Sequence, residues 1–128
     1  MIIIIDDDAV QRLLVKRAIS GLRNVLVPET AEEIDDLPTD PELVIVDRHM
    51  TGDWKKNRDE YLKNIPSDRI VEWTIAHHHD DFHKLPGTSH VITKSGTGRE
   101  VLELIKSWRV SHKSNGLIAA ILTAIGLH

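Results

Sequence analysis

Three aspartates that follow two apolar runs are the residues of this chain best suited to chemistry. Asp6 and Asp7 come directly after the apolar residues 2–5, and Asp47 comes directly after residues 43–46. Because the carboxyl ends of adjacent parallel strands lie side by side in an open α/β sheet, we expect these carboxylates to converge on one pocket. Clustered carboxylate oxygens suit a hard divalent cation such as Mg²⁺ or Mn²⁺, and with it a phosphoryl group.

The composition predicts one globular domain without thiol chemistry. A chain of 128 residues with 41% hydrophobic and 28% charged residues is long enough to bury a core but too short for two domains. The net charge of −4 gives no electrostatic footprint for nucleic acid. The absence of cysteine excludes disulfides and thiolate metal sites and fits a reducing compartment, so we expect a cytoplasmic protein.

Neither the apolar run at residues 2–5 nor the one at residues 117–127 predicts a targeting or membrane-spanning element. Residues 2–5 are too short for the apolar region of a signal peptide and lead directly into three acids. Residues 117–127 amount to about half of the roughly 20 residues that a membrane-spanning helix needs. We therefore expect no membrane span.

Strand and helix signals alternate from the first residue to Trp108. Short apolar runs predict five strands, at residues 2–5, 25–27, 43–46, 70–74 and 90–93. Amphipathic spacing predicts a helix after each strand, with a weak and short signal at residues 80–85 after the fourth. Five such repeats imply an α/β fold, in which a parallel sheet is covered by helices on both faces.

Capping residues and apolar spacing predict where the helices begin and which faces they bury. Asp8 is a candidate N-cap for a helix that ends near Gly21, and Thr30 and Thr97 each open a capping box with a glutamate three residues later. The residues expected to face the core are Val10, Leu13, Leu14 and Ala18; Ala31, Ile34 and Leu37; Trp54, Tyr61, Leu62 and Ile65; and Val101, Leu104, Ile105 and Trp108.

Polar residues stand at the ends of four of the five expected strands. Asp6 and Asp7 follow the first strand and Asp47 follows the third. Thr74 ends the fourth strand and Lys94 follows the fifth. With this pattern the chain resembles a response regulator receiver domain, the phosphoacceptor half of two-component signalling. The resemblance implies a single flavodoxin-like (βα)5 doubly wound parallel sheet with strand order 2-1-3-4-5.

The resemblance covers about residues 1–109, which we expect to form the receiver domain, and leaves out residues 110–128. It implies a stand-alone protein that accepts a phosphoryl group from a sensor histidine kinase or a phosphotransfer protein. Such a protein signals to a downstream protein through altered contacts. It catalyses at most its own phosphorylation and dephosphorylation and is not a conventional enzyme.

The resemblance also implies a role for each residue at the strand ends. Asp47 is expected to accept the phosphoryl group in a Mg²⁺-dependent reaction, and Lys94 to pair first with Asp47 and then with a phosphoryl oxygen. Thr74 is expected to hydrogen-bond the phosphoryl group and draw its loop inward. The implied ligands of the metal are Asp6, Asp7, Asp47 and the backbone carbonyl of His49.

Three neighbouring positions depart from the family pattern. Ser95 stands where proline is usual, Val91 where many members have a switching aromatic, and Ile75 where a small residue normally leaves room for the phosphoryl group. These departures leave a second function open, a pseudo-receiver that acts as a phosphorylation-independent interaction or dimerisation module. A hydrolase of small phosphoesters is a more remote third interpretation, because no second acid or substrate-binding domain accompanies Asp47.

Two further features have no role in that scheme. Glu72 lies in an expected interior strand, where a carboxylate is costly unless it is paired, and the sequence does not identify its partner. His77, His78 and His79, with His83 one helical turn beyond the last of them, could chelate Zn²⁺. A solvated loop is the favoured interpretation of this histidine cluster.

The tail is expected to form a separate element. Residues 110–116 are polar and end in glycine, like a linker, and residues 117–127 predict an apolar helix that needs a partner. We expect it to pack on its own domain or in a homodimer, since it lacks the basic flank that favours a membrane surface. The apolar stripe consists of Leu117, Ile118, Ile121, Leu122 and Ile125.

Overall fold

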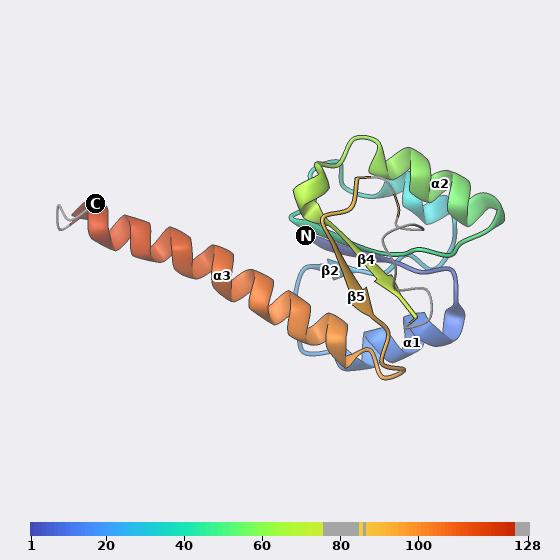
Figure 1. The fold of residues 1–128 in the computed structure, drawn as a ribbon, viewed down its shortest axis with the longest axis horizontal. Helices are drawn as coiled ribbons and strands as arrows, with labels where there is room; N and C mark the ends of the chain where they lie inside the picture. Colours follow the sequence, from blue (N-terminus) through green and yellow to red (C-terminus); the bar gives the residue numbers. More distant parts are fainter. Residues whose placement is uncertain (76–84, 86, 125–128) are drawn as a thin grey trace.

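The fold is built around a five-stranded parallel sheet (Figure 1). The computed structural model describes residues 1–75, 85 and 87–124, with residues 112–124 as backbone only. The strands lie in the order β2-β1-β3-β4-β5, which confirms the predicted fold and strand order. Their bounds are β1 Ile2–Ile5, β2 Val25–Leu26, β3 Leu43–Asp47, β4 Ile70–Thr74 and β5 His90–Thr93.

The register of the strands brings their carboxyl ends to one edge. Ile5 of β1 pairs with Val46 of β3. Asp47 pairs with Trp73, and Thr74 pairs with the last residue of β5. The polar residues that end or follow these strands therefore emerge at the same edge of the sheet.

The two central strands are buried on both faces. All four isoleucines of β1 are at most 1% exposed, and residues 43–46 of β3 are fully buried. A continuous run of β-branched residues is what such a strand requires, because neither of its faces meets water. Burial of each isoleucine contributes about 1.5–3 kcal/mol, so these strands anchor the fold.

Helices cover the two faces of the sheet (Figure 1). One face packs against α1, Ala9–Ala18, and the first turns of α3, Arg99–Ala124. The other face packs against α2, Gly52–Leu62, and the 3₁₀ helix η1, Glu32–Asp36. A second 3₁₀ turn, η2, spans Ser67–Arg69 and leads into β4.

The face by which α1 meets the sheet differs from the prediction. Asp8 caps the helix as expected, since its Oδ1 accepts hydrogen bonds from the backbone N–H groups of residues 10 and 11. However, Val10 is 63% exposed and Leu13 is 50% exposed, whereas Val15 and Ile19 are buried. The sequence of α1 contains two overlapping apolar stripes, and packing against α3 selects the second one.

The capping boxes form with altered partners. Thr30 Oγ1 accepts from the N–H of Glu33 as predicted, but the Glu33 carboxylate accepts from the N–H of Glu29 rather than from that of Thr30. Thr97 Oγ1 accepts from the N–H of Arg99, the first residue of α3. The short helix predicted after Thr30 is a 3₁₀ helix of five residues.

The linker expected at residues 110–116 is absent. A single helix, α3, runs from Arg99 to Ala124 and extends away from the sheet (Figure 1). One glycine without proline costs a helix only about 1 kcal/mol, which does not interrupt it. Among the described residues, no helix has the length and apolar character needed to cross a membrane. The division of the chain at residue 109 stays a prediction, and the expected helix at 80–85 lies outside the described residues.

Replacing Gly98 by alanine should destabilise the fold. Gly98 has φ +76°, and an added Cβ would lie 3.0 Å from the Cα of Val15, where backbone of α1 leaves no room. We expect a loss of about 1–3 kcal/mol in the free energy of unfolding.

Urea denaturation of Gly98→Ala and Gly21→Ala would check this expectation. Gly21 has no positive φ, and an added Cβ there meets nothing within 4 Å. The Gly21 variant should unfold within about 0.5 kcal/mol of the wild type or slightly above it. Equal effects of the two substitutions would contradict the close approach of α1 to Gly98.

Candidate functional site

A pocket of about 160 Å³ opens at the carboxyl edge of the sheet. It collects residues from four different strand ends, among them every residue to which the resemblance gave a role at the strand ends. The lining residues are Asp6, Asp7, Asp8, Asp47, His49, Thr74, Ile75 and Lys94.

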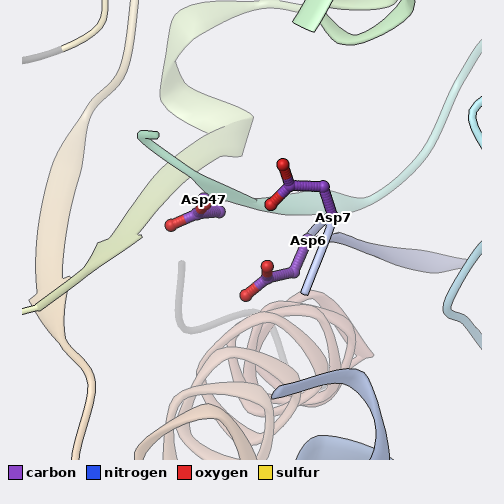
Figure 2. Close-up of side chains that lie close together, drawn as sticks. All are labelled: Asp6, Asp7 and Asp47. Carbon is purple, nitrogen blue, oxygen red and sulfur yellow. The ribbon is translucent and has the colours of Figure 1, made fainter. Parts of the chain in front are cut away.

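Three carboxylates share the centre of this pocket. One oxygen each of Asp6, Asp7 and Asp47 lies within 4.8 Å of the others, and Figure 2 shows the three groups gathered at the ends of β1 and β3. Asp6 and Asp47 are buried, and Asp7 is half-buried. An all-oxygen donor set of this kind matches the preference of Mg²⁺ and Mn²⁺.

Lys94 is the cation that faces these acids. Its Nζ lies 2.8 Å from Asp6 Oδ2 and 3.0 Å from Asp47 Oδ1. With all groups ionised, three carboxylates and one ammonium leave an excess of two negative charges. A divalent cation would balance that excess, which is a second reason why the residues present fit Mg²⁺.

Burial and crowding shift the ionisation of these groups. Burial, and then the charge of Asp6, raises the pKa of Asp47 to about 6 even though Lys94 acts in the opposite direction. Burial likewise raises the pKa of Asp6. The pKa of Lys94 is raised, because attraction to Asp6 and Asp47 outweighs its burial. The ionised forms of Asp6 and Asp47 are therefore less stable in the site than they would be in water.

Thr74 places a polar atom without a partner beside the carboxylates. Its side chain is 0% exposed, and within the described part of the chain its Oγ1 has no hydrogen-bond partner. A buried hydroxyl in this condition costs about 1–3 kcal/mol. The orphaned hydroxyl and the excess negative charge of its neighbours fit a site that binds a cation together with a hydrogen-bond acceptor.

Two other predicted residues lie at the mouth of the pocket. His49 is exposed, and the use of its carbonyl as a metal ligand stays a prediction. Ile75 follows Thr74 directly and is 37% exposed. Its side chain forms part of the lining of the pocket, and its predicted effect on access of a phosphoryl group stays a prediction.

The sequence missed a buried arginine below the site. Arg58 of α2 is 1% exposed, and its Nη1 donates to the carbonyl of Asp47 at 3.0 Å and to that of Arg48 at 2.8 Å. These bonds fix the backbone at the end of β3. The available signal was the position of Arg58 within the apolar spacing of α2, four residues after Trp54.

The partner of Glu72 is also revealed. Arg48 Nη2 donates to Glu72 Oε2 at 2.8 Å, and both side chains are at most 2% exposed. The other carboxylate oxygen accepts from the backbone N–H of Leu85 at 2.8 Å. This buried ion pair connects the residue after Asp47 with β4. The histidine cluster lies outside the described residues.

The structure is similar to solved receiver domains. It matches the response regulator TrrA from Thermotoga maritima, in complex with Mg²⁺ and BeF, with a TM-score of 0.61 and 23% identity over 84% of this chain and 96% of that chain. The BeF3-activated receiver domain of DrrB matches with a TM-score of 0.60 and 21% identity, over 84% of this chain and 94% of that one. A receiver-modulated diguanylate cyclase from Pelobacter carbinolicus matches with a TM-score of 0.56 and 24% identity, over 90% of this chain and 96% of that one.

These likenesses establish the fold. The chain has the fold of response regulator receiver domains, as the order of residues at its strand ends predicted. No family model matches the sequence, and no curated protein matches it.

Replacing Asp47 by asparagine should stabilise the metal-free protein above pH 6. The pKa of Asp47 is about 6 in the folded protein against an ordinary value of 3.8, so the folded state binds more protons than the unfolded state between these pH values. Stability of the wild type therefore falls as the pH rises from about 4 to 6 and stays lower above that. The variant lacks this loss and should gain on the order of 2–3 kcal/mol at pH 7.

The measurement is the free energy of unfolding at several pH values in a metal chelator. The gain of Asp47→Asn over wild type should disappear near pH 4. Asp36→Asn, which replaces an exposed acid of η1, serves as the matched control. A gain that does not depend on pH would contradict the raised pKa.

Replacing the arginine of the buried Arg48–Glu72 ion pair should strongly destabilise the fold. Arg48→Met leaves a fully buried carboxylate without its charge partner, with an expected cost of about 3–5 kcal/mol. Adding Glu72→Gln should restore a large part of the loss, because a neutral amide oxygen still accepts from Leu85. Denaturant unfolding of both variants tests this, and a double variant less stable than the single one would rule out the pairing.

Proposed function

We propose that this chain is a response regulator receiver, which accepts a phosphoryl group on Asp47 from a phosphohistidine of a sensor kinase or phosphotransfer protein. The observation that carries the proposal is the meeting of three carboxylates, one ammonium and an unpartnered buried hydroxyl in one pocket. Each of these groups has a use in moving a phosphoryl group, and they come from four separate strand ends.

Asp6, Asp7 and Asp47 would hold Mg²⁺ or Mn²⁺, with the carbonyl of His49 as the proposed backbone ligand. Bound there, the ion supplies positive charge that neutralises both the crowded carboxylates and the oxygens of an incoming phosphoryl group. The solved structures of TrrA, in complex with Mg²⁺ and BeF, and of the BeF3-activated DrrB receiver domain support a site of this type in a chain with this fold.

Asp47 would act as the nucleophile. With a pKa of about 6, its carboxylate is mostly ionised at neutral pH, as attack on phosphorus requires. The new bond joins a carboxylate oxygen to phosphorus, the bond from phosphorus to the histidine nitrogen breaks, and that nitrogen is left as the leaving group and regains a proton. The product on this chain is an acyl phosphate.

Lys94 and Thr74 would bind the transferred group. The ammonium of Lys94 already lies 3.0 Å from Asp47 Oδ1, so it can pair with a phosphoryl oxygen attached to the same carboxylate. The Thr74 hydroxyl would gain the acceptor that it lacks among the described residues. The N–H of Lys94 donates to the carbonyl of Thr74 at 2.7 Å, which joins the two strand ends that receive the group.

A pseudo-receiver is the second candidate. Ile75 at the pocket mouth and the non-aromatic Val91 favour it, because they alter access to the site and the usual route of its conformational signal. In that case the protein would act through contacts that do not depend on phosphorylation.

The wider setting is part of the proposal. Residues 1–109 would be the receiver unit of a cytoplasmic signalling protein whose output is a contact with a downstream protein. The length of α3 beyond Arg109 offers a second copy of the chain a place to pack, which is how a homodimer would form.

The proposal predicts that Asp47→Asn abolishes binding of a phosphoryl mimic. Wild type should bind Mg²⁺ and then beryllium fluoride, and each ligand should raise the melting temperature because it binds the folded state alone. Asp47→Asn should lose the second step, since the mimic bonds to the aspartate oxygen.

Thermal unfolding and tryptophan emission provide the readouts, because Trp73 lies close to the site: its ring centroid is 4.5 Å from Lys94 Nζ. Asp36→Asn should behave as wild type. If the wild type responds to Mg²⁺ but not to beryllium fluoride, the pseudo-receiver is favoured. If it responds to neither, the receiver proposal is wrong.

A further inference from the structure

Glu100 lies behind the pocket without lining it. It belongs to the first turn of α3, and its Oε1 accepts hydrogen bonds from Trp73 Nε1 at 2.9 Å and from the N–H of Ser95 at 3.1 Å. Its second oxygen accepts from the hydroxyl of Ser95. One carboxylate thus joins β4 to the loop that follows β5.

Trp73 contacts both Glu100 and the pocket residue Lys94. The indole is 0% exposed, and the ammonium of Lys94 lies 4.5 Å from the centroid of its ring. An ammonium over the face of an indole is attracted by the negative face of the ring, and the attraction is stronger where water is excluded. The hydrogen bond from Nε1 to Glu100 fixes the plane of that ring.

Ser95 links Glu100 to the backbone of Lys94. Ser95 follows Lys94 directly, so its N–H belongs to the peptide group that joins the two residues. Glu100 accepts from that N–H, and the Lys94 side chain rests on the ring that Glu100 also holds. Both the backbone and the side chain of Lys94 are therefore held through a single carboxylate.

The ionisation of Glu100 agrees with this arrangement. Burial opposes the charge of its carboxylate, but hydrogen bonds from Ser95 and Trp73 outweigh it and lower the pKa. The acceptor is thus anionic at neutral pH, and hydrogen bonds to an ionised acceptor are shorter and stronger than neutral ones.

We infer that Glu100 and Trp73 are positioning residues for Lys94, which they hold where its ammonium can pair with the phosphoryl group on Asp47. The inference rests on the proposed phosphoryl acceptance by Asp47. In this chain, which has Ser95 rather than proline after Lys94, the hydrogen bonds from Ser95 to Glu100 stabilise the loop after β5. A simple role of Glu100 in starting α3 would stabilise the fold without affecting how the phosphoryl mimic binds.

The test measures two dissociation constants for the full chain, that of Mg²⁺ alone and that of beryllium fluoride at saturating Mg²⁺. Fluorine NMR detects the bound mimic independently of the tryptophans. Glu100→Ala should leave the constant for Mg²⁺ within about twofold and weaken the mimic by about tenfold, the size expected for loss of a charged hydrogen bond.

Conservative variants separate positioning from packing. In Glu100→Gln the amide oxygen still accepts from Trp73 and Ser95, so binding of the mimic should return to within about threefold of wild type. Trp73→Phe keeps a ring but loses the N–H and should weaken the mimic as well. Glu103→Ala, which removes an exposed acid from the same helix, is the matched control and should bind as wild type does.

The outcomes are distinct. Wild-type affinity for the mimic in Glu100→Ala would overturn the inference, as would an equal loss in Glu103→Ala. If Glu100→Ala does not fold, Trp73→Phe decides, and unchanged binding in that variant would also overturn the inference. A wild type that binds Mg²⁺ but no mimic refutes phosphoryl acceptance itself, and the inference falls with it.

Discussion

The pairing of β1 with β3 is the constraint on which the rest of the structure depends. Because Ile5 stands opposite Val46, the next residue in each case, Asp6 after β1 and Asp47 at the end of β3, emerges beside the other. Both strands are covered by helices on both faces. A slip of one residue would exchange the faces of every side chain and separate the two acids, so packing of the core also sets the geometry of the site.

The site works against the stability of the fold that holds it. The buried Asp6 and Asp47, the half-buried Asp7, and a hydroxyl that lacks a partner among the described residues lie close together, and burial is the largest cause of the raised pKa of Asp47. The apolar burial of the central strands offsets this cost. A cation and a phosphoryl group would relieve both the crowding and the orphaned hydroxyl, which gives ligand binding a physical reason to change the local structure.

Three other charged side chains near the site have hydrogen-bond partners among the strands, and they come from both sides of the sheet. Arg58 of α2 binds the carbonyls at the end of β3, and Arg48 pairs with Glu72 of β4. On the opposite face Glu100 of α3 binds Trp73. Each of these contacts joins a helix or a loop to a strand of the sheet, so the positions of the pocket residues depend on packing between segments that are far apart in the chain.

The sequence by itself determined the strands and the acids at their ends, because runs such as residues 43–46 and the residues that follow them are local signals. The order of the strands in the sheet was implied by the resemblance to receiver domains. The sequence also identified Thr74 and Lys94 by their places on successive strands. Only the tertiary structure decided that Val15 rather than Val10 faces the sheet, that Arg48 neutralises Glu72, and that Glu100 reaches Trp73. These outcomes depend on which side of a helix meets the sheet and on side chains that lie 24 and 27 residues apart, and no local pattern contains that information.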